Sequence, residues 1–550
     1  MKICAVCITI LWFLANTSAL PQSAPPTIAQ GGVVNLASRM PTRLNGGAIA
    51  PGSLISIRGW RFAPAGAESR APDASLAESL AGTSVRIKQG ASEISAPLIA
   101  VSANEIQALI PPSLAPGDVE MRVSRNGQIS RTPARLRLMD SGFGIFSRNR
   151  KGWGPGDIEN SDGQPNAPER AAKPGELLAL RGTGLGPATA QASVQVIVGN
   201  QVADAARIAR ASSGARITQG DEVAFAVPQG APEGCYVPLR VRIGDRVSNT
   251  VTLAVSPSGG ACNPADDASF ASHLSEPGRF ALVALARVAL RIALTPRKKV
   301  DYLMDTGYAR FELGTPGETS NPYRLLPVAG TCTTLADQMM LSSVIKPASI
   351  ILRSGGTRLD AGSTMTLQGP HGQRQFPVAD GGLIGGNTPL PRPESKRFPS
   401  FLSPGEYSAS APGGHDIPPF ETQVQVTEPI RWMNRDELET VDRERGVTVK
   451  WHAAKPDSLI LITALNSDQQ SDNVGVCLCV QRASAEEFHV PPDALANIPP
   501  TPADAQGLPT NLLLLAELPS DNTTHPAGSS GLDRVTAVFV SVSGKTVSFR

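Results

Sequence analysis

Short runs of alternating apolar and polar residues, punctuated by glycine and proline, recur along most of this chain. In Pro51–Gly59 (Pro-Gly-Ser-Leu-Ile-Ser-Ile-Arg-Gly) a Pro-Gly turn leads into a strand-like run that ends on glycine. Pro174–Gly182 (Pro-Gly-Glu-Leu-Leu-Ala-Leu-Arg-Gly) repeats this arrangement. A period of two is typical of a half-buried strand, and Pro-Gly is a turn signal. The two copies predict two tandem modules of one kind.

Further features recur in the same order and strengthen the repeat. Ile110–Gly117 corresponds to Val227–Gly234, and the strand-like runs that follow end at Val123 and Val241. Short strands with regularly spaced turn signals predict β-sandwiches, here at residues 31–140 and 173–262. Between them, residues 141–172 form a connector whose apolar residues we expect to pack between the modules, namely Phe143, Ile145, Phe146 and Trp153.

The pattern changes after Asn263. Phe280–Leu294 alternates over an unusually long stretch, which predicts a long strand or a strand pair, with an alanine-rich helix as the alternative. A short helix is expected near Pro491, with Asp493 in its first turn. We expect two β-rich units, at residues 263–430 and 431–550, because further strand-like runs occur at residues 348–353, 364–367, 421–426, 447–451, 458–462, 475–480 and 535–542.

Composition agrees with an all-β reading. The 550 residues include 52 glycines and 48 prolines, whereas charged residues make up 18% and aromatic residues 5%. Such a composition favours many short strands joined by turns. The formal net charge is +2, and the longest basic run is Arg297–Lys299. Nucleic acid is therefore not an expected partner.

The first residues predict export. Met1-Lys2 precedes the apolar run Ile3–Leu14 and small residues up to Ala19, which fits a signal peptide at residues 1–19 and a leader at 20–30. The run is too short to span a membrane, so the mature chain is expected to lack a transmembrane segment; an uncleaved anchor is the alternative. We therefore predict an extracellular or cell-surface protein.

Four segments resemble a known family. Val34–Ser38, Ala50–Ser53, Leu80–Val85 and Gly182–Pro187 are similar to segments of uncharacterised bacterial extracellular proteins with tandem IPT/TIG modules. The resemblance covers residues 31–265, although Glu105–Ala108 departs from the usual Gln-Ile-Asn. It implies that each module is an early-set Ig-like sandwich, and it transfers no catalytic residue. The predicted fold is all-β, with tandem Ig-like sandwiches followed by a β-rich, sandwich-like C-terminal region.

Five cysteines remain after the signal peptide. A bridge between Cys235 and Cys262 would close the end of the second module, as expected in an oxidising compartment. Cys332 can pair with Cys477 or Cys479, and we take Cys479 as the working partner. Cys477 and Cys479 lie on one face of a strand and are poorly placed to pair with each other.

The sequence offers little that predicts catalysis. There is no Gly-x-Ser-x-Gly motif, and none of the six histidines has metal-ligand spacing to another His or Cys. Gly413–Glu421 contains His415, Asp416 and Glu421, which could form an acid/base or metal site; a tight glycine turn capped by Asp416 is favoured. We assign no catalytic, metal or cofactor residue. Carboxylates for a hydrolase would come from Asp360, Asp416, Asp442 and Glu444.

Candidate binding residues are aromatic or lie in loops. Trp451 follows an alternating run and is expected in the core. Trp432 is the preferred surface contact, with Tyr407 and His415 in or beside the Phe401–Gly414 segment as further candidates. We predict a non-enzymatic protein for adhesion, scaffolding or binding, whose partner is a polysaccharide or another cell-surface protein. Carbohydrate binding by the C-terminal region and a secreted hydrolase are the alternatives.

Overall fold

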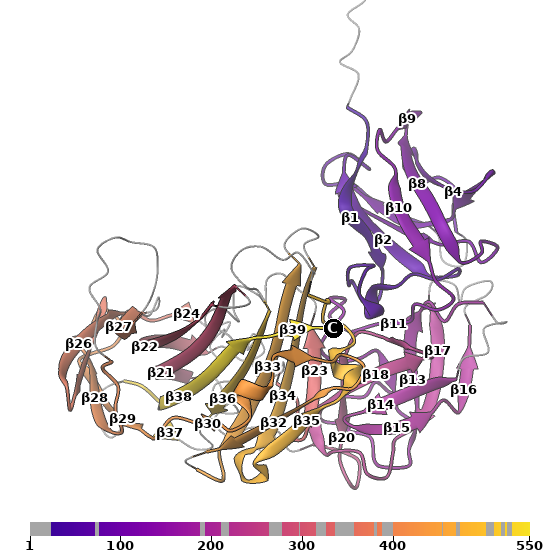
Figure 1. Cartoon of the computed structure of the whole chain (residues 1–550). Helices are drawn as coiled ribbons and strands as arrows, with labels where there is room; N and C mark the ends of the chain where they lie inside the picture. Colours follow the sequence, from indigo (N-terminus) through magenta and orange to yellow (C-terminus); the bar gives the residue numbers. More distant parts are fainter. Residues whose placement is uncertain are drawn as a thin grey trace, which may run out of the picture.

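The computed structural model describes residues 24–71, 76–187, 193–210, 219–262, 278–295, 298–314, 326–335, 357–378, 382–387, 400–453, 455–468, 473–501, 511–518, 523–524 and 531–550. The predicted signal peptide, part of the leader and the predicted strand at 348–353 lie outside these residues. Figure 1 shows two Ig-like modules beside a larger C-terminal region, all built from strands. The all-β prediction is confirmed.

The first module is a sandwich of two five-stranded sheets. Their inward residues form one core that includes Ile57, Val85 and Ile106, all completely buried. One sheet has the order β1-β2-β7-β6-β3, with β1 (Thr27–Asn35), β2 (Leu54–Trp60), β3 (Glu68–Arg70), β6 (Leu98–Ser102) and β7 (Glu105–Leu109). The other contains β4 (Thr83–Gln89), β5 (Ser92–Ala96), β8 (Gly117–Arg125), β9 (Gln128–Ile129) and β10 (Ala134–Leu138).

The second module repeats this architecture and takes two strands from the connector. One sheet contains β11 (Gly144–Ile145), β12 (Ile158–Glu159), β13 (Leu177–Thr183), β16 (Arg207–Ala209) and β17 (Asp221–Ala226). The other contains β14 (Val194–Val198), β15 (Gln201–Asp204), β18 (Gly234–Ile243), β19 (Arg246–Val247) and β20 (Val251–Val255). Both connector strands pair with β13, so residues 141–172 are continuous with the second sandwich.

The apolar connector residues have separate destinations. Phe143 and Ile145 enter the core of the second module. Phe146 packs against Leu54 and its neighbours in the first module, and Trp153 packs against the core of the C-terminal region. The connector therefore contacts all three parts of the protein.

The repeated turn-strand motif has a structural cause. Gly52 and Gly175 adopt φ angles of +83° and +81°, which a residue with a Cβ rarely tolerates. A Cβ at Gly59 would lie 2.1 Å from the Thr27 carbonyl oxygen, and one at Gly182 would lie 2.4 Å from that of Gly144. Both strand-closing glycines allow the preceding strand to approach closely.

The C-terminal region is organised around one ten-stranded sheet. Its main path is β23-β34-β33-β36-β38-β21-β22-β24, in which β21 and β38 are parallel; β27 and β37 pair at its sides. The bounds are β21 (Gly278–Thr295), β22 (Lys298–Gly314), β23 (Thr331–Leu335), β24 (Thr357–Arg358), β27 (Gly382–Asn387), β33 (Leu459–Asp468), β34 (Asn473–Arg482), β36 (Leu512–Leu518), β37 (Thr523–Thr524) and β38 (Arg534–Thr546). The sheet takes strands from both sides of residue 430, so the predicted boundary does not separate two sheets.

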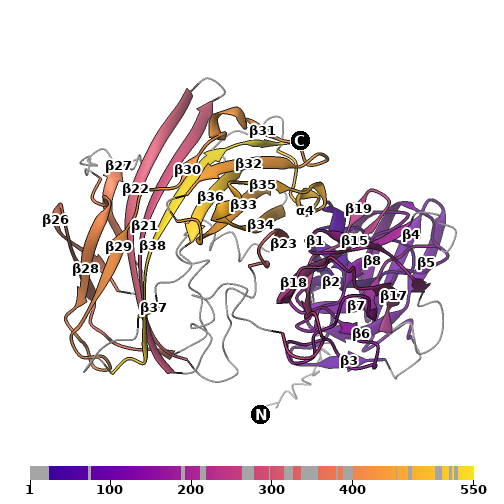
Figure 2. The ribbon, with the colours of Figure 1, turned by 90° about the horizontal axis from the view of Figure 1, so that it is seen from below.

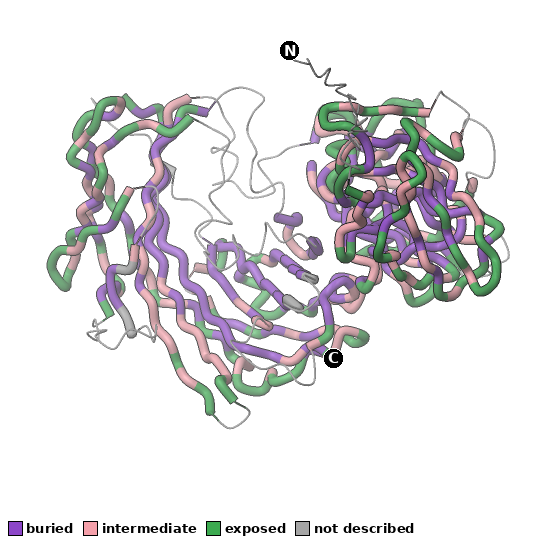
Figure 3. The backbone as a smooth tube through the Cα atoms, turned by 90° about the horizontal axis from the view of Figure 1, so that it is seen from above, coloured by how far each residue is buried: buried purple, intermediate pink, exposed green. Residues whose placement is uncertain are grey.

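The long strand predicted at Phe280–Leu294 is present as β21, which forms a hairpin with β22 (Figure 2). Leu282 and Ala284 point into the core on one face of the sheet, whereas Ala281 and Val283 point into the core on the other. A strand buried on both faces has a continuous apolar sequence, which explains its resemblance to a helix. Figure 3 shows buried residues along most of this sheet.

Two small sheets cover one face of the large sheet. The first has the order β26-β25-β28-β29, with β25 (Thr364–Gly369), β26 (Gly372–Pro377), β28 (Gly405–Ala411) and β29 (Phe420–Val426), and it packs over β21 and β22. The second has the order β30-β32-β35, with β30 (Arg431–Trp432), β32 (Val447–His452) and β35 (Glu487–Val490), and it packs over β33, β34 and β36. The short pair β31 (Thr440–Val441) and β39 (Ser548–Phe549) lies beside it, and the predicted helix is present as α4 (Pro492–Leu495).

Buried polar contacts join the three parts. The Asn497 side chain, 1% exposed, accepts a hydrogen bond from the Gly46 N–H of the first module at 2.6 Å and donates one to the Ser248 carbonyl of the second at 2.9 Å. Arg240 on β18 is 1% exposed and pairs with Asp493 of α4 at 2.6 Å. Both contacts fix the C-terminal region against the modules.

Candidate functional site

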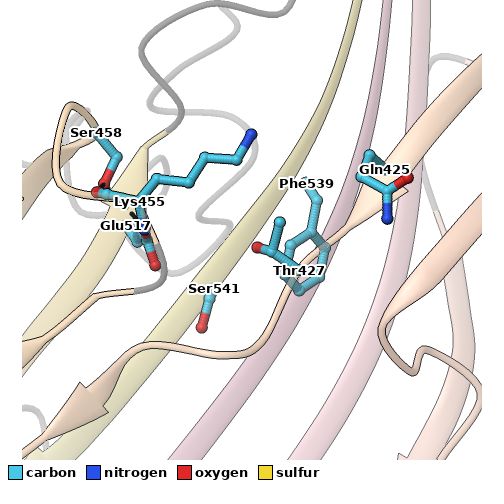
Figure 4. A pocket seen from close by; sticks show the side chains of 7 residues that line it. All are labelled: Gln425, Thr427, Lys455, Ser458, Glu517, Phe539 and Ser541. Atoms are coloured by element: carbon cyan, nitrogen blue, oxygen red, sulfur yellow. Dashed lines mark hydrogen bonds between the residues drawn. The ribbon is translucent and has the colours of Figure 1, made fainter.

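A small surface pocket lies where the two covering sheets meet the large sheet. We call it the seam pocket (Figure 4); it is lined by Gln425, Thr427, Lys455, Ser458, Glu517, Phe539 and Ser541. Gln425 and Thr427 come from the end of β29 and the segment after it. Lys455 and Ser458 lie between β32 and β33, and the other three residues come from β36 and β38.

Glu517 is the chemical centre of this pocket. Its side chain is at the end of β36 and only 6% of the residue is exposed. The Ser458 hydroxyl donates to Glu517 Oε1 at 2.8 Å, and the Lys455 backbone N–H lies 3.4 Å from the same oxygen. Glu517 Oε2 has no hydrogen-bond partner among the described residues. Half of a buried carboxylate is therefore left without a donor.

The opposite wall is formed by β38. Ser541 lies directly opposite Glu517 in the register between β36 and β38. Its hydroxyl accepts a hydrogen bond from the Ile430 N–H at 2.9 Å, which ties the segment between the covering sheets to β38. Phe539, two positions earlier, supplies an apolar surface. Alternation along the strand places both side chains on the same face.

Lys455 brings the only lysine charge to the pocket lining. The residue is partly exposed. In Figure 4 this ammonium points away from the Glu517 carboxylate. The pocket thus combines a carboxylate, a separate cation, hydroxyl groups and an aromatic ring, which can bind a polar ligand through several hydrogen bonds.

The aromatic residues proposed from the sequence do not lie in this pocket. Trp432 is 8% exposed and its Nε1–H donates to Asn434 Oδ1 at 3.1 Å. Tyr407 is completely buried, and its hydroxyl donates to the Phe401 carbonyl at 3.1 Å. Both side chains face the core beneath a covering sheet, because each occupies an inward position of its strand. Neither ring offers a ligand-binding surface, which corrects both assignments.

Trp451 is buried as expected, at 2% exposed, with its Nε1–H donated to the Ala483 carbonyl at 2.9 Å. Trp60 is 54% exposed at the end of β2, far in sequence from the seam pocket.

His415 lies in an exposed turn. Its Nδ1 is 2.9 Å from Asp416 Oδ1, and the hydrogen bond and charge of that carboxylate raise the pKa of His415. Asp416 accepts the Asp360 N–H at 2.8 Å, while Asp360 accepts the His415 N–H at 3.0 Å. These backbone hydrogen bonds lower the pKa of both carboxyl groups. The three side chains stabilise a reciprocal turn, with Asp416 capping Asp360 rather than the backbone that follows it.

The remaining candidate carboxylates also have structural partners. Glu421 Oε1 accepts the Ser408 hydroxyl at 2.6 Å across the β28–β29 pair. Asp442 Oδ1 accepts the N–H groups of Glu444 and Arg445 at 2.9 and 3.1 Å, which makes a turn.

Two disulfides are present, Cys235–Cys262 and Cys332–Cys479. The buried Cys477 thiol remains free, 3.8 Å from the Cys479 sulfur, and burial raises its pKa to about 12. The three sulfur atoms of Cys332, Cys477 and Cys479 lie within 4.8 Å of one another, but two of them are consumed by the disulfide. Disulfides are consistent with an extracellular location.

No helix among the described residues is long and apolar enough to cross a bilayer. No known family model matches the chain, and no curated protein matches it. The tandem Ig-like sandwiches are thus described from the structure alone, and no family is identified for them.

Solved structures that resemble the chain are distant. A Bacteroides thetaiotaomicron protein of unknown function shares 12% identity at a TM-score of 0.15; 56% of this chain and 62% of that chain are covered, less than two thirds of its length. SGBP-B from a Bacteroides ovatus mixed-linkage glucan utilization locus, solved with a mixed-linkage heptasaccharide, shares 12% identity at a TM-score of 0.13, with 86% and 96% covered. InvD of Yersinia pseudotuberculosis shares 10% identity at a TM-score of 0.13, and the match covers 68% of this chain and 93% of that chain.

The seam pocket is not predicted by any local pattern, although the sequence contains one signal. Glu517 interrupts the apolar strand Leu512–Leu518, where an acidic residue is unexpected. A charge inside such a strand indicates either a buried partner or a binding site. Its neighbours in the pocket come from three other chain segments, and no local pattern connects them.

Proposed function

We propose that the protein is a secreted or cell-surface binding protein without enzymatic activity, in which two Ig-like modules support the C-terminal region. Its partner would be a polysaccharide or another cell-surface protein. The observation that carries this proposal is the buried junction between the three parts. It favours a protein whose binding surface is held in a fixed orientation.

The junction selects one arrangement of the parts because its polar groups are buried. An arrangement that kept these groups buried but displaced them would leave unpaired the Arg240–Asp493 charges and the two backbone groups bonded to Asn497. A buried donor or acceptor without a partner costs about 1–3 kcal/mol, and a buried charge more. Flexible tethers between modules lack such contacts.

The carboxylates support binding over hydrolysis. Glycosidic cleavage needs one acid with a raised pKa beside an ionised one. Asp360 and Asp416 lie together, but hydrogen bonds lower the pKa of each. Burial raises the pKa of Glu312 to about 7, but this side chain is completely buried beside Arg310 and is closed to a substrate.

The test is retention of the full-length secreted protein on bacterial cell envelopes and on insoluble polysaccharides, with bovine serum albumin as the control. We expect saturable retention and no release of reducing sugar. Absence of retention on every surface contradicts the binding role. Release of sugar that Asp416→Ala or Glu421→Ala abolishes would instead establish a hydrolase.

A further inference from the structure

The seam pocket contains an unbalanced set of polar groups. Glu517 is a buried carboxylate with one oxygen, Oε2, that no described residue satisfies. Buried polar atoms almost always have a partner, and a carboxylate without one is costly. Because this carboxylate lines a pocket at the surface, a bound group that donates a hydrogen bond can supply the missing partner.

Lys455 defines the second requirement. Lys455 lines the same pocket, and its ammonium group points away from the Glu517 carboxylate (Figure 4). An ammonium group only donates hydrogen bonds, so it requires an acceptor. The ligand therefore needs a donor for Glu517 and a separate acceptor for Lys455.

The hydroxyl groups of a sugar meet both requirements, because each hydroxyl offers one donor and two acceptors. The pocket adds the hydroxyls of Thr427 and Ser541 and the amide of exposed Gln425 as further partners. Phe539 gives an apolar surface against which the C–H groups of a sugar ring can pack. The pocket is small and open, which suits the edge of one sugar unit in a longer chain.

We propose that the seam pocket binds a saccharide, with one sugar hydroxyl donating to Glu517 and another accepting from Lys455. This proposal rests on the binding role proposed above and gives that role a ligand class and a site. The seam between the covering sheets holds the site rigidly, because Ser541 fixes the Ile430 backbone beside it.

The experiment measures the affinity of the full-length secreted protein for soluble β-glucan, xylan, galactomannan and dextran by isothermal titration calorimetry. Glu517→Gln preserves shape but replaces the unpaired acceptor with an amide, and Lys455→Met removes the cation. Hydrogen bonds to charged groups are strong enough that each variant should lose about tenfold or more in affinity. Glu428→Gln, a neutralised exposed carboxylate next to Thr427 and outside the pocket lining, should bind as wild type.

The possible results separate the site from the general function. Circular dichroism and the melting temperature establish that each variant is folded, and Lys455→Met retains the test if Glu517→Gln does not fold. A saccharide that binds both pocket variants with wild-type affinity overturns this site but leaves the binding role. Retention by a protein component of the envelope, with no saccharide bound, overturns the ligand class. If the wild type binds neither a saccharide nor a protein component of the envelope, the proposed function itself is wrong.

Discussion

Asp305 offers the sharpest test of how the large sheet is stabilised. This residue of β22 is completely buried opposite Arg287 of β21. Its carboxylate accepts hydrogen bonds from Arg287 Nε at 2.8 Å and Nη2 at 3.0 Å, the Ser400 hydroxyl at 3.0 Å, and the backbone N–H groups of Phe401 and Leu402 at 2.7 and 3.0 Å. The chosen perturbation is Asp305→Asn, which keeps the volume and removes the charge.

The hairpin contains its own matched control. Asp301 pairs with Arg291 at 2.8 Å on the same two strands, but its side chain is 65% exposed. Breaking a buried ion pair costs about 3–5 kcal/mol because the partner remains buried and uncompensated. An exposed pair contributes about 0–1 kcal/mol. For a unit of this size, Asp305→Asn should lower the melting temperature of the C-terminal transition by roughly 6–20 °C, and Asp301→Asn by a few degrees at most.

The pH dependence gives a second readout. Burial alone raises the pKa of Asp305, but the hydrogen bonds from Arg287 and the backbone outweigh it, and the net pKa is lowered. Its stabilisation is therefore complete above its unfolded pKa, about 4, and is lost as the pH falls through the lower folded value. We expect differential scanning calorimetry to show a smaller difference in melting temperature between the wild type and Asp305→Asn at pH 3 than at pH 7. The reasoning would be refuted if Asp305→Asn and Asp301→Asn lowered the melting temperature equally. A difference in melting temperature between the wild type and Asp305→Asn that did not depend on pH would also refute it.

Three further perturbations test other parts of the structure. The pKa of Glu312 is raised to about 7 from an ordinary 4.5, so the folded state retains a proton that the unfolded state releases, and the melting temperature should decline as the pH rises through this interval. Glu312→Gln should abolish that decline, and an unchanged pH profile of the melting temperature would contradict the prediction. Cys477, buried and with a pKa of about 12, should resist iodoacetamide until the protein is denatured, and rapid labelling of the folded protein would disprove this. Asn497→Ala leaves the Gly46 N–H and the Ser248 carbonyl unpaired, at a cost of about 1–3 kcal/mol each, which destabilises the junction. X-ray scattering should therefore show a larger radius of gyration, and an unchanged radius would show that the junction does not depend on Asn497.

The strands could be predicted well from local pattern. The repeated segments Pro51–Gly59 and Pro174–Gly182 contain the corresponding strands β2 and β13, and the runs at 447–451 and 475–480 are strands β32 and β34. The element Phe280–Leu294 is ambiguous because its first half is buried on both faces and has no polar side, while Arg287 and Arg291 come only later in the strand. Alternation of apolar and polar residues identifies a strand only where one of its faces is exposed, so a segment buried on both faces lacks this signal.

The candidate site was beyond local reasoning for a related cause. Trp432 and Tyr407 were selected because large aromatic residues near loops often contact ligands, yet both point into cores that covering sheets close. Which side of a short strand is covered depends on segments distant in the chain. Glu517 and Ser541 became neighbours only through the pairing of β36 with β38.

The sequence by itself determined the all-β class, the tandem modules and the short helix α4, because turn residues and a period of two act over a few neighbouring positions. The tertiary structure alone decided that strands from both halves of the C-terminal region share one sheet, that the connector belongs to the second sandwich, and that a carboxylate, a lysine and a phenylalanine from three segments meet at one seam. These arrangements depend on pairing between distant strands, which requires hydrogen-bond partners and complementary apolar faces that no single segment encodes.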